Sequence, residues 1–270
     1  MDINLKDTRI GVVGCGKMAS AILGGAFKNN FLVNENVFVY DKDLEASARL
    51  CSKYNFNEAY SIKDLVSNVD IIFIAVKPYN YREVLLEIKE NYNNQLILSI
   101  LAGVKIKKYE AILPDAPIVR IMPNTPALVN EGISALCFNE NVDEIDKEFA
   151  LKFMQNCGNV IATTEDKIDV ITALSGSGPA FYFELIHLLA KSAQKLGLDY
   201  KDAIMLSAQT ALGSAKMLIE NEFKVDELIK NVTTPGGCTE VGNNVLLNSD
   251  IDIVFDKLIQ DTTNKAIELG

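Results

Sequence analysis

The sequence of 270 residues contains no tryptophan and only one histidine, His187. A single histidine, without cysteine pairs near it, argues against zinc sites of the usual kind and against a Ser-His-Asp triad, so we expect no metal. The five cysteines are odd in number and widely spaced, and no two form a Cys-x-x-Cys pair. This usage predicts reduced thiols inside a cell rather than a disulfide framework.

Long apolar runs and a basic excess are also missing. No stretch approaches the roughly 18 apolar residues of a membrane span, and the apolar run near the N-terminus is too short for a signal peptide. Lysine and arginine number 26 against 36 acidic residues, which gives a net charge of −10. Such a field repels nucleic acid and anionic membranes. We therefore expect a cytoplasmic protein without nucleic-acid or membrane partners, whose anionic ligands are held by local backbone N–H groups.

Two domains are predicted from the length and from a change in pattern along the chain. In residues 1–165, short β-branched runs alternate with amphipathic segments, whereas residues 166–270 show helical spacing only. Strands are predicted at residues 9–13, 36–40, 70–76, 95–100 and 117–122, and helices at residues 18–28, 44–54 and 81–89. The pattern indicates an α/β Rossmann-type doubly wound parallel sheet, followed by an all-helical domain.

The first predicted turn carries GCGKMA, a G-x-G-x-x-A between a strand and a helix. Gly14 permits the tight turn, Gly16 lets a pyrophosphate approach the backbone, and small Ala19 lets the helix pack closely; Lys17 and Met18 open that helix. The pattern alone is weak. Its position after a strand favours nucleotide binding over a purely structural glycine turn.

Asp41 follows the next predicted strand, at the distance from the glycines that the dinucleotide fingerprint requires. A carboxylate there accepts hydrogen bonds from ribose hydroxyls and repels a 2′-phosphate, which favours NADH over NADPH. Lys42 weakens this preference, because it could neutralise the phosphate. The alternative is that Asp41 caps the helix beginning near Leu44.

Further candidates lie in loops after predicted strands, where open α/β sheets bind ligands. Val76, Lys77 and Pro78 form one such loop, and a second contains Ala102. Lys77 could meet phosphate, ribose or substrate charge, or could be a surface lysine before a proline turn. In MPNTPA, two prolines hold Asn124 in a rigid loop, which makes its amide a candidate for substrate binding; a plain turn is the alternative.

The second half begins with SGSGPA and a long segment that is apolar on almost every side. Such a helix is predicted to be buried, in a core that includes a second subunit. Further helices are predicted at residues 200–220, capped by Asp199, and at residues 225–232. His187 is predicted to be structural, with Glu184 as its partner.

The stretch TTPGGCT, residues 233–239, interrupts this helical half. Hydroxyls, a proline and two glycines are typical of a loop that leads into a helix N-terminus, where exposed N–H groups suit a carboxylate. A capped turn between two helices uses the same residue types and remains the alternative.

Taken together, GVVGCGKMASAILGG, AVKP, MPNTPA, ALSGSGPA and VTTPGGCT resemble the pyrroline-5-carboxylate reductase family, in this order and over essentially the whole chain. The resemblance implies a Rossmann domain, a helical dimerisation domain, and reduction of a cyclic imino acid to proline by NADPH or NADH. It also implies a homodimer or higher oligomer whose active site is shared between subunits. The substrate carboxylate would then be bound by the loop around Gly236 and Gly237.

Specific roles also follow from the resemblance. Thr239 would approach the imine nitrogen as the catalytic hydroxyl, and Gly237 and Cys238 would donate backbone N–H groups to the carboxylate. Thr234 and Ser177 would lie nearby.

The sequence departs from the family pattern close to this loop. Cys238 replaces a residue that is usually threonine-like, and Glu240 replaces an isoleucine. Leu247 and Asp252 stand where a glutamate and an arginine are usual, and Ile229 and Lys230 replace a charged pair. These changes retain the glycines and the hydroxyl but alter the residues that support them.

Two other functions share parts of this pattern. A β-hydroxyacid dehydrogenase needs a proton donor, commonly a lysine soon after the glycine-rich turn, and here the first is Lys191, too far along the helix. A nucleotide sensor without catalysis would have no need of the second anion site at the TTPGGCT loop.

Overall fold

The computed structural model describes residues 8–270. These residues form two compact units, one containing the chain up to Ser177 together with Thr262–Gly270, and the other containing Gly178–Asp261. The sequence predicted a domain boundary after residue 165, whereas the boundary between the two compact units lies after Ser177. The domain boundary at residue 165 stays a prediction. The expectation about a signal peptide concerns residues 1–14, of which residues 1–7 lie outside the described residues.

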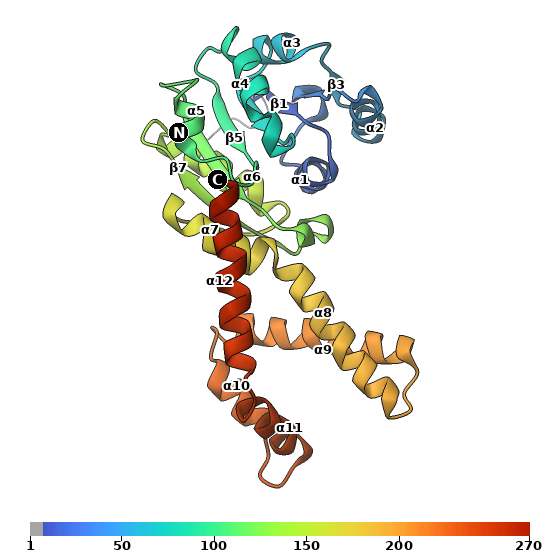
Figure 1. The fold of residues 1–270 in the computed structure, drawn as a ribbon. Helices are drawn as coiled ribbons and strands as arrows, with labels where there is room; N and C mark the ends of the chain where they lie inside the picture. Colours follow the sequence, from blue (N-terminus) through green and yellow to red (C-terminus); the bar gives the residue numbers. More distant parts are fainter. Residues whose placement is uncertain (1–7) are drawn as a thin grey trace. The chain divides into compact units, whose positions relative to one another are not determined.

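The first unit is built on an eight-stranded sheet in the order β3-β2-β1-β4-β5-β6-β7-β8 (Figure 1). The strands are β1 (Ile10–Val13), β2 (Val37–Tyr40), β3 (Asn57–Glu58), β4 (Ile71–Ile74), β5 (Leu96–Ser99), β6 (Ile118–Met122), β7 (Gly132–Phe138) and β8 (Gly158–Ala162). Strands β1 to β6 pair in parallel, which confirms the predicted sheet, whereas β7 pairs antiparallel with β6. The sequence analysis missed this reversal. The segment between β6 and β7 is too short for the helical crossover that a parallel pair needs.

Helices separate most of these strands. They are α1 (Lys17–Lys28), α2 (Leu44–Tyr54), α3 (Ile62–Ser67), α4 (Tyr81–Lys89), α5 (Ile106–Glu110), α6 (Glu144–Gln155) and α7 (Ile168–Ile171). Short 3-10 turns lie at η1 (Asn34–Asn36), η2 (Pro78–Asn80), η3 (Thr125–Val129) and η4 (Glu165–Lys167), and a π-helical turn, η5 (Thr172–Gly176), follows α7. Asp43, Ser61 and Asp143 cap helices α2, α3 and α6 by accepting backbone N–H bonds, as short polar side chains at N-caps do.

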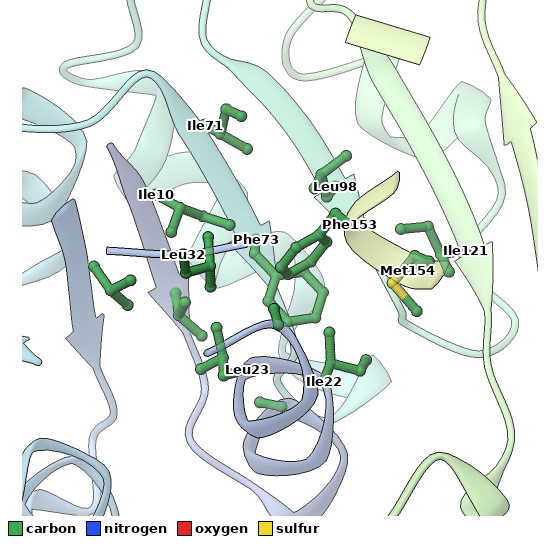
Figure 2. Close-up of a cluster of buried hydrophobic side chains, with 14 of the residues drawn as sticks. Ile10, Ile22, Leu23, Leu32, Ile71, Phe73, Leu98, Ile121, Phe153 and Met154 are labelled. Atoms are coloured by element: carbon green, nitrogen blue, oxygen red, sulfur yellow. The ribbon is translucent and has the colours of Figure 1, made fainter. Parts of the chain in front are cut away.

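Two clusters of buried apolar side chains cover the two faces of the sheet. Alternate residues of one strand point to opposite faces, so Phe73 lies in one cluster and Ile72 in the other. The first cluster includes Ile22 of α1 and Phe153 of α6 (Figure 2). The second includes Leu85 of α4 and other apolar residues of α3 to α5. Helices on both faces therefore give this unit a complete core.

The second unit is helical throughout. Its helices are α8 (Gly178–Lys195), α9 (Tyr200–Glu220), α10 (Val225–Val232), α11 (Cys238–Leu247) and α12 (Ile251–Leu269), and the last of these ends in the first unit. Asp199 accepts N–H bonds from two residues at the start of α9, which confirms the predicted cap. The predicted partner of His187 was wrong, because its Nδ1 lies 2.7 Å from the hydroxyl oxygen of Tyr200 rather than meeting Glu184.

The predicted burial of α8 in a core that includes a second subunit stays a prediction, because most of this helix is exposed in a single chain. Only Gly178 and Ala190 of this helix are buried, whereas Tyr182, Phe183, Leu188 and Leu189 are exposed. Helix α8 packs against α9, but one neighbour covers only one side of a helix that is apolar on several.

Candidate functional site

The glycine loop after β1 has the geometry of a phosphate cradle. Gly14 has a φ of +103°, and a Cβ there would lie 2.7 Å from the carbonyl group of Ala75, so glycine is required. Gly16 is the N-cap of α1 and has no side-chain cap, and a Cβ there would meet nothing within 4 Å. The start of α1 therefore offers backbone N–H groups beside open space, which suits an anion such as pyrophosphate.

A cavity of about 920 Å³ lies at the carboxyl ends of β1, β2, β4, β5 and β6. This is the end of an α/β sheet where ligands bind, and the volume suits a small-molecule cofactor. The predicted cofactor-binding residues that line it are Gly14, Gly16, Lys17, Met18, Asp41, Lys42, Val76, Lys77, Pro78 and Ala102. Residues distant in the sequence thus share one cavity.

Asp41 holds the glycine loop in place. Its Oδ2 accepts a hydrogen bond from the backbone N–H of Cys15 at 2.7 Å, and its Oδ1 accepts one from Asp43 at 3.0 Å. The alternative role as a helix cap is wrong, because Asp43 caps α2. Each carboxylate oxygen has a second lone pair, so Asp41 retains acceptor capacity for a ribose hydroxyl.

The cavity carries charges of both signs. Lys17, Lys42 and Lys77 line it together with Asp41, Glu83 and Glu87. The Cys15 thiol adds no charge, because burial and the nearby Asp41 carboxylate raise its pKa to about 12. The lysines therefore offer local attraction for phosphate in a protein whose net charge is −10.

Asn124 and Ser177, predicted to bind substrate, have different surroundings. Asn124 lines the cavity and is buried, and its Oδ1 accepts a hydrogen bond from the N–H of Ile133 at 2.9 Å. Its amide oxygen thus fixes the loop between β6 and β7. Ser177 does not line this cavity; Gly176 does, at the end of the π-helical turn.

The sequence analysis missed part of the cavity wall. Tyr79, Ile62, Glu83, Glu87 and Met122 all line it. The two glutamates stand four residues apart on α4, a spacing that places side chains on one helix face and would have indicated a shared direction. Ile62 and Met122 have no signal of this kind, because their positions follow from how helices and strands meet.

The loop of residues 233–239 belongs to the second unit. Gly236 has a φ of +73°, and the N–H of Gly237 donates to the carbonyl of Thr234 at 2.9 Å. Gly237 is then the N-cap of α11, whose first residues are Cys238 and Thr239. The predicted helix N-terminus is therefore confirmed.

A carboxylate already occupies one N–H group of this loop. The N–H of Gly236 donates to Oε2 of Glu240 at 2.8 Å. Cys238 and Thr239 are exposed, and the hydroxyl of Thr233 is turned away to the carbonyl of Ile229 at 2.7 Å. The loop geometry thus suits carboxylate binding at a helix N-terminus.

Metal-binding clusters and membrane-spanning helices are both absent from residues 8–270. No cluster of three or more His, Cys, Asp or Glu side chains there could hold a metal ion. No helix in the same range is long and apolar enough to cross a membrane.

Comparison with known proteins matches both parts of the chain to family profiles. Residues 165–269 match the profile described as pyrroline-5-carboxylate reductase dimerisation, and residues 9–103 match that described as NADP oxidoreductase, coenzyme F420-dependent. A pyrroline-5-carboxylate reductase of Aquifex aeolicus is 37% identical over 262 residues, which cover 97% of each chain.

Solved structures agree. A pyrroline-5-carboxylate reductase from Coxiella burnetii superimposes with a TM-score of 0.93 at 34% identity, covering 97% of this chain and 98% of that one. The pyrroline carboxylate reductase of Plasmodium falciparum, solved with NADP bound, has a TM-score of 0.86 at 32% identity, covering 98% of both chains.

Proposed function

Because this chain belongs to the pyrroline-5-carboxylate reductase family, we infer that it reduces 1-pyrroline-5-carboxylate to L-proline with hydride from NADPH or NADH. The observation that carries this conclusion is the 37% identity to a reductase of that name over 97% of each chain. The reaction class is oxidoreductase acting on a C=N bond.

The residues of the first unit fit a nicotinamide dinucleotide. Gly14, Gly16 and the start of α1 would hold the pyrophosphate, and Asp41 and Lys42 would meet the adenosine ribose. The open space beside Gly16 supports this placement. Lys77 and Pro78, at the end of the neighbouring strand, would complete the cofactor wall together with Ala102.

For the substrate, we propose that the carboxylate binds at the loop around Gly236 and Gly237, with N–H donation from Cys238 and Gly237. The Gly237 N–H would first have to leave the carbonyl of Thr234, to which it donates at 2.9 Å. The Gly236 N–H already binds the carboxylate of Glu240, which supports the fit of such a group. Substrate that used this N–H would have to displace Glu240. Thr234, Ser177 and Asn124 are proposed to complete the substrate site.

The chemical step needs alignment more than acid catalysis. The bound cofactor supplies a hydride to C5 of the imine, whose C=N electron pair moves onto a nitrogen already protonated by solvent. Thr239 would orient that nitrogen and stabilise the amine through its hydroxyl. Holding two reactants in line contributes about 7 to 11 kcal/mol in favourable cases, so no charged side chain is required.

Self-association would complete the second unit. Its helices expose Tyr182, Phe183, Leu189 and Leu206, among other large apolar side chains. Exposed apolar surface of this extent is typical of an interface, and the matched dimerisation profile covers these helices. We propose a homodimer or higher oligomer, in a cytoplasmic location that suits the five free cysteines.

The test is the initial rate of NADPH and NADH oxidation by purified protein with 1-pyrroline-5-carboxylate. A β-keto acid is the control substrate. We expect oxidation with the imine alone, faster with NADH, because Asp41 lines the cavity and its carboxylate would repel a 2′-phosphate. Oxidation only with the keto acid would contradict the substrate assignment, and equal efficiency with both cofactors would contradict the role of Asp41.

A further inference from the structure

Arg120 is a buried cation in the middle of an apolar strand. It lies on β6 between Val119 and Ile121, and its side chain is 3% exposed. A charge removed from water to this degree must be paired. Its Nη1 lies 2.8 Å from Oε1 of Glu165, and its Nη2 lies 4.0 Å from Oδ1 of Asp169. We name these three residues the ion triad.

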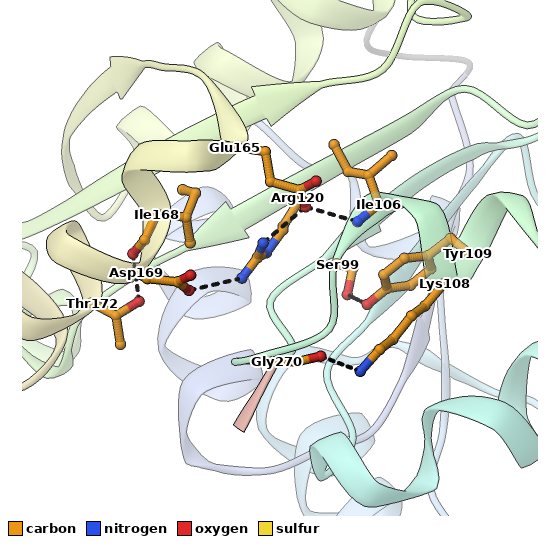
Figure 3. A network of polar contacts seen from close by, with 10 residues as sticks. All are labelled: Ser99, Ile106, Lys108, Tyr109, Arg120, Glu165, Ile168, Asp169, Thr172 and Gly270. Carbon is orange, nitrogen blue, oxygen red and sulfur yellow. Dashed lines mark hydrogen bonds and ion pairs between the residues drawn. The ribbon is translucent and has the colours of Figure 1, made fainter. Parts of the chain in front are cut away.

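The triad connects three segments of the chain (Figure 3). The same Oε1 of Glu165 that meets Arg120 also accepts a hydrogen bond from the N–H of Ile106 at 2.8 Å. Glu165 therefore joins β6 to the start of α5. Asp169 lies on α7 and brings that helix to the same guanidinium group.

Each connected segment leads directly to the cavity wall. Met122 and Ala102 both line the cavity. Arg120 stands two residues before Met122, and Ile106 stands four residues after Ala102. Helix α7 continues without a break into the π-helical turn that ends at Gly176. The triad thus fixes three separate parts of one wall through a single buried cation.

The π-helical turn brings its end close to β6. Its wide hydrogen bond runs from the N–H of Ser177 to the carbonyl of Thr172 at 2.9 Å. A Cβ on Gly176 would lie 2.5 Å from Cε of Met122, so the turn and the strand end are in close contact. Single π-helical turns are rare and are frequently found at functional sites.

This wall lies opposite the adenosine end of the cavity. Asp41 and Lys42 follow β2, on one side of β1, whereas β5 and β6 lie on the other side. In a doubly wound sheet the dinucleotide crosses this switch point, with its reactive ring beyond it. The wall that the triad supports is therefore the one facing the nicotinamide ring, given the proposed function.

We propose that Arg120, Glu165 and Asp169 are positioning residues that hold the wall around the nicotinamide ring in the geometry for hydride transfer. A displacement of about 1 Å at a reacting centre costs about a hundredfold in rate. The adenosine end, held by the glycine loop and Asp41, has no part in this support. The triad is therefore expected to affect kcat more than cofactor affinity.

The test uses Glu165→Gln, which keeps the shape and removes the charge opposite Arg120. We expect kcat to fall about tenfold or more, with a larger isotope effect for deuterated nicotinamide cofactor, because hydride transfer becomes slower. Binding of ADP-ribose, which lacks the nicotinamide ring, is expected to stay within about twofold. Asp169→Asn is expected to have the same effect in smaller measure, because its pair with Arg120 is longer.

The matched control is Asp70→Asn. Asp70 also accepts a backbone N–H, from Arg9, and pairs with the Arg9 side chain at 3.7 Å, but it does not line the cavity. It is expected to leave kcat unchanged. A kcat of Glu165→Gln and Asp169→Asn within twofold of the unmodified protein would overturn the proposal, as would parallel losses of kcat and ADP-ribose binding, which indicate a folding role alone. Lack of imine reduction by the unmodified protein would instead contradict the proposed function.

Discussion

The two units of this protein differ in how much apolar surface each buries within a single chain. The first covers both faces of its sheet with its own helices and fully buries residues as large as Phe73, Tyr109 and Phe153. The second buries only small residues, Gly178, Ala190 and Ala203, within its own chain. The first unit therefore derives its stability from internal contacts. The second needs another surface to cover its apolar residues.

The two units also differ in where their candidate binding groups lie. The first unit holds the cavity at the carboxyl ends of its parallel strands, where strand ends and short loops form the cavity walls. The second unit presents its loop of residues 233–239 with Cys238 and Thr239 exposed. Cofactor binding thus depends on the interior of one unit, whereas substrate binding is expected to depend on assembly.

Alkaline pH is expected to lower the free energy of unfolding of the first unit, and this is the largest effect that we predict. Burial raises the pKa of Cys15 and Cys137 to about 12 and that of Cys157 to about 11, from an ordinary value of 9.0. Because the folded state keeps these thiols protonated, their contribution is complete below pH 9 and is lost as the pH rises towards 11 or 12. At pH 10 the three thiols together are expected to lower the free energy of unfolding by about 4 kcal/mol.

Denaturant unfolding of the protein between pH 8 and pH 10 measures this loss. Replacing the three buried cysteines by alanine should flatten the pH dependence, whereas replacing exposed Cys238 should not change it. A pH dependence that survives the triple replacement would refute the assignment.

A methyl group at Gly14 should be the next largest change. Gly14→Ala places Cβ 2.7 Å from the backbone of Ala75 at a φ of +103°, which we expect to cost about 3 kcal/mol of unfolding free energy. Gly16→Ala is the matched variant, because its Cβ meets nothing. It should keep the melting temperature and weaken cofactor binding, as measured by calorimetric titration. Similar melting temperatures for the two variants would contradict this distinction.

A charge on α8 tests the dependence of the second unit on another copy. Leu189→Glu places a carboxylate on an apolar side chain that is 63% exposed in the single chain. If that surface is covered by self-association, the variant should lose about 2 kcal/mol or more of association free energy, measured by sedimentation. Gln194→Glu adds the same charge at a polar position of the helix. Equal effects of the two variants would exclude an interface at Leu189.

The smallest expected effect concerns one hydroxyl. Thr239→Val keeps the volume and removes the group proposed to orient the imine nitrogen, so kcat should fall about tenfold, or about 1.4 kcal/mol, with unchanged melting temperature. Thr233→Val in the same loop is the control, because the hydroxyl of Thr233 bonds to its own helix. Unchanged kinetics in Thr239→Val would remove this residue from the proposed mechanism.

Much of the architecture followed from local patterns. The predicted helices at residues 44–54, 81–89, 200–220 and 225–232 have these same bounds in the structure. Apolar spacing is a property of neighbouring residues, and so are the aspartate N-caps of α2 and α9. Strands β1, β2, β4, β5 and β6 were predicted to within one or two residues, whereas the parallel strands β3 and β8 were missed. The reversal at β7 was missed, since strand direction depends on where a loop returns.

Some parts of the candidate site could likewise be predicted from local patterns, and others could not. The glycine loop, Asp41 and the loops at Lys77 and Ala102 could be found because fixed spacings after strands carry a known geometry. The members of the ion triad could not be predicted to meet from the sequence alone. Arg120 within the apolar run PIVRIM indicated only that this charge has some partner. Its partners lie 45 and 49 positions further along the chain.

By itself, the sequence determined the two-part plan, the glycine turn after β1 and the loop that leads into α11, because these depend on glycine conformations and periodicity within a few residues. Only the tertiary structure decided that Asp41 binds Cys15 rather than capping α2, and that Arg120, Glu165 and Asp169 meet beneath the cavity wall. Hydrogen bonds and ion pairs act over a few ångströms in space. Residues that are far apart in the sequence come within this range only when the sheet and its helices pack, so their separation along the chain does not reveal the contact.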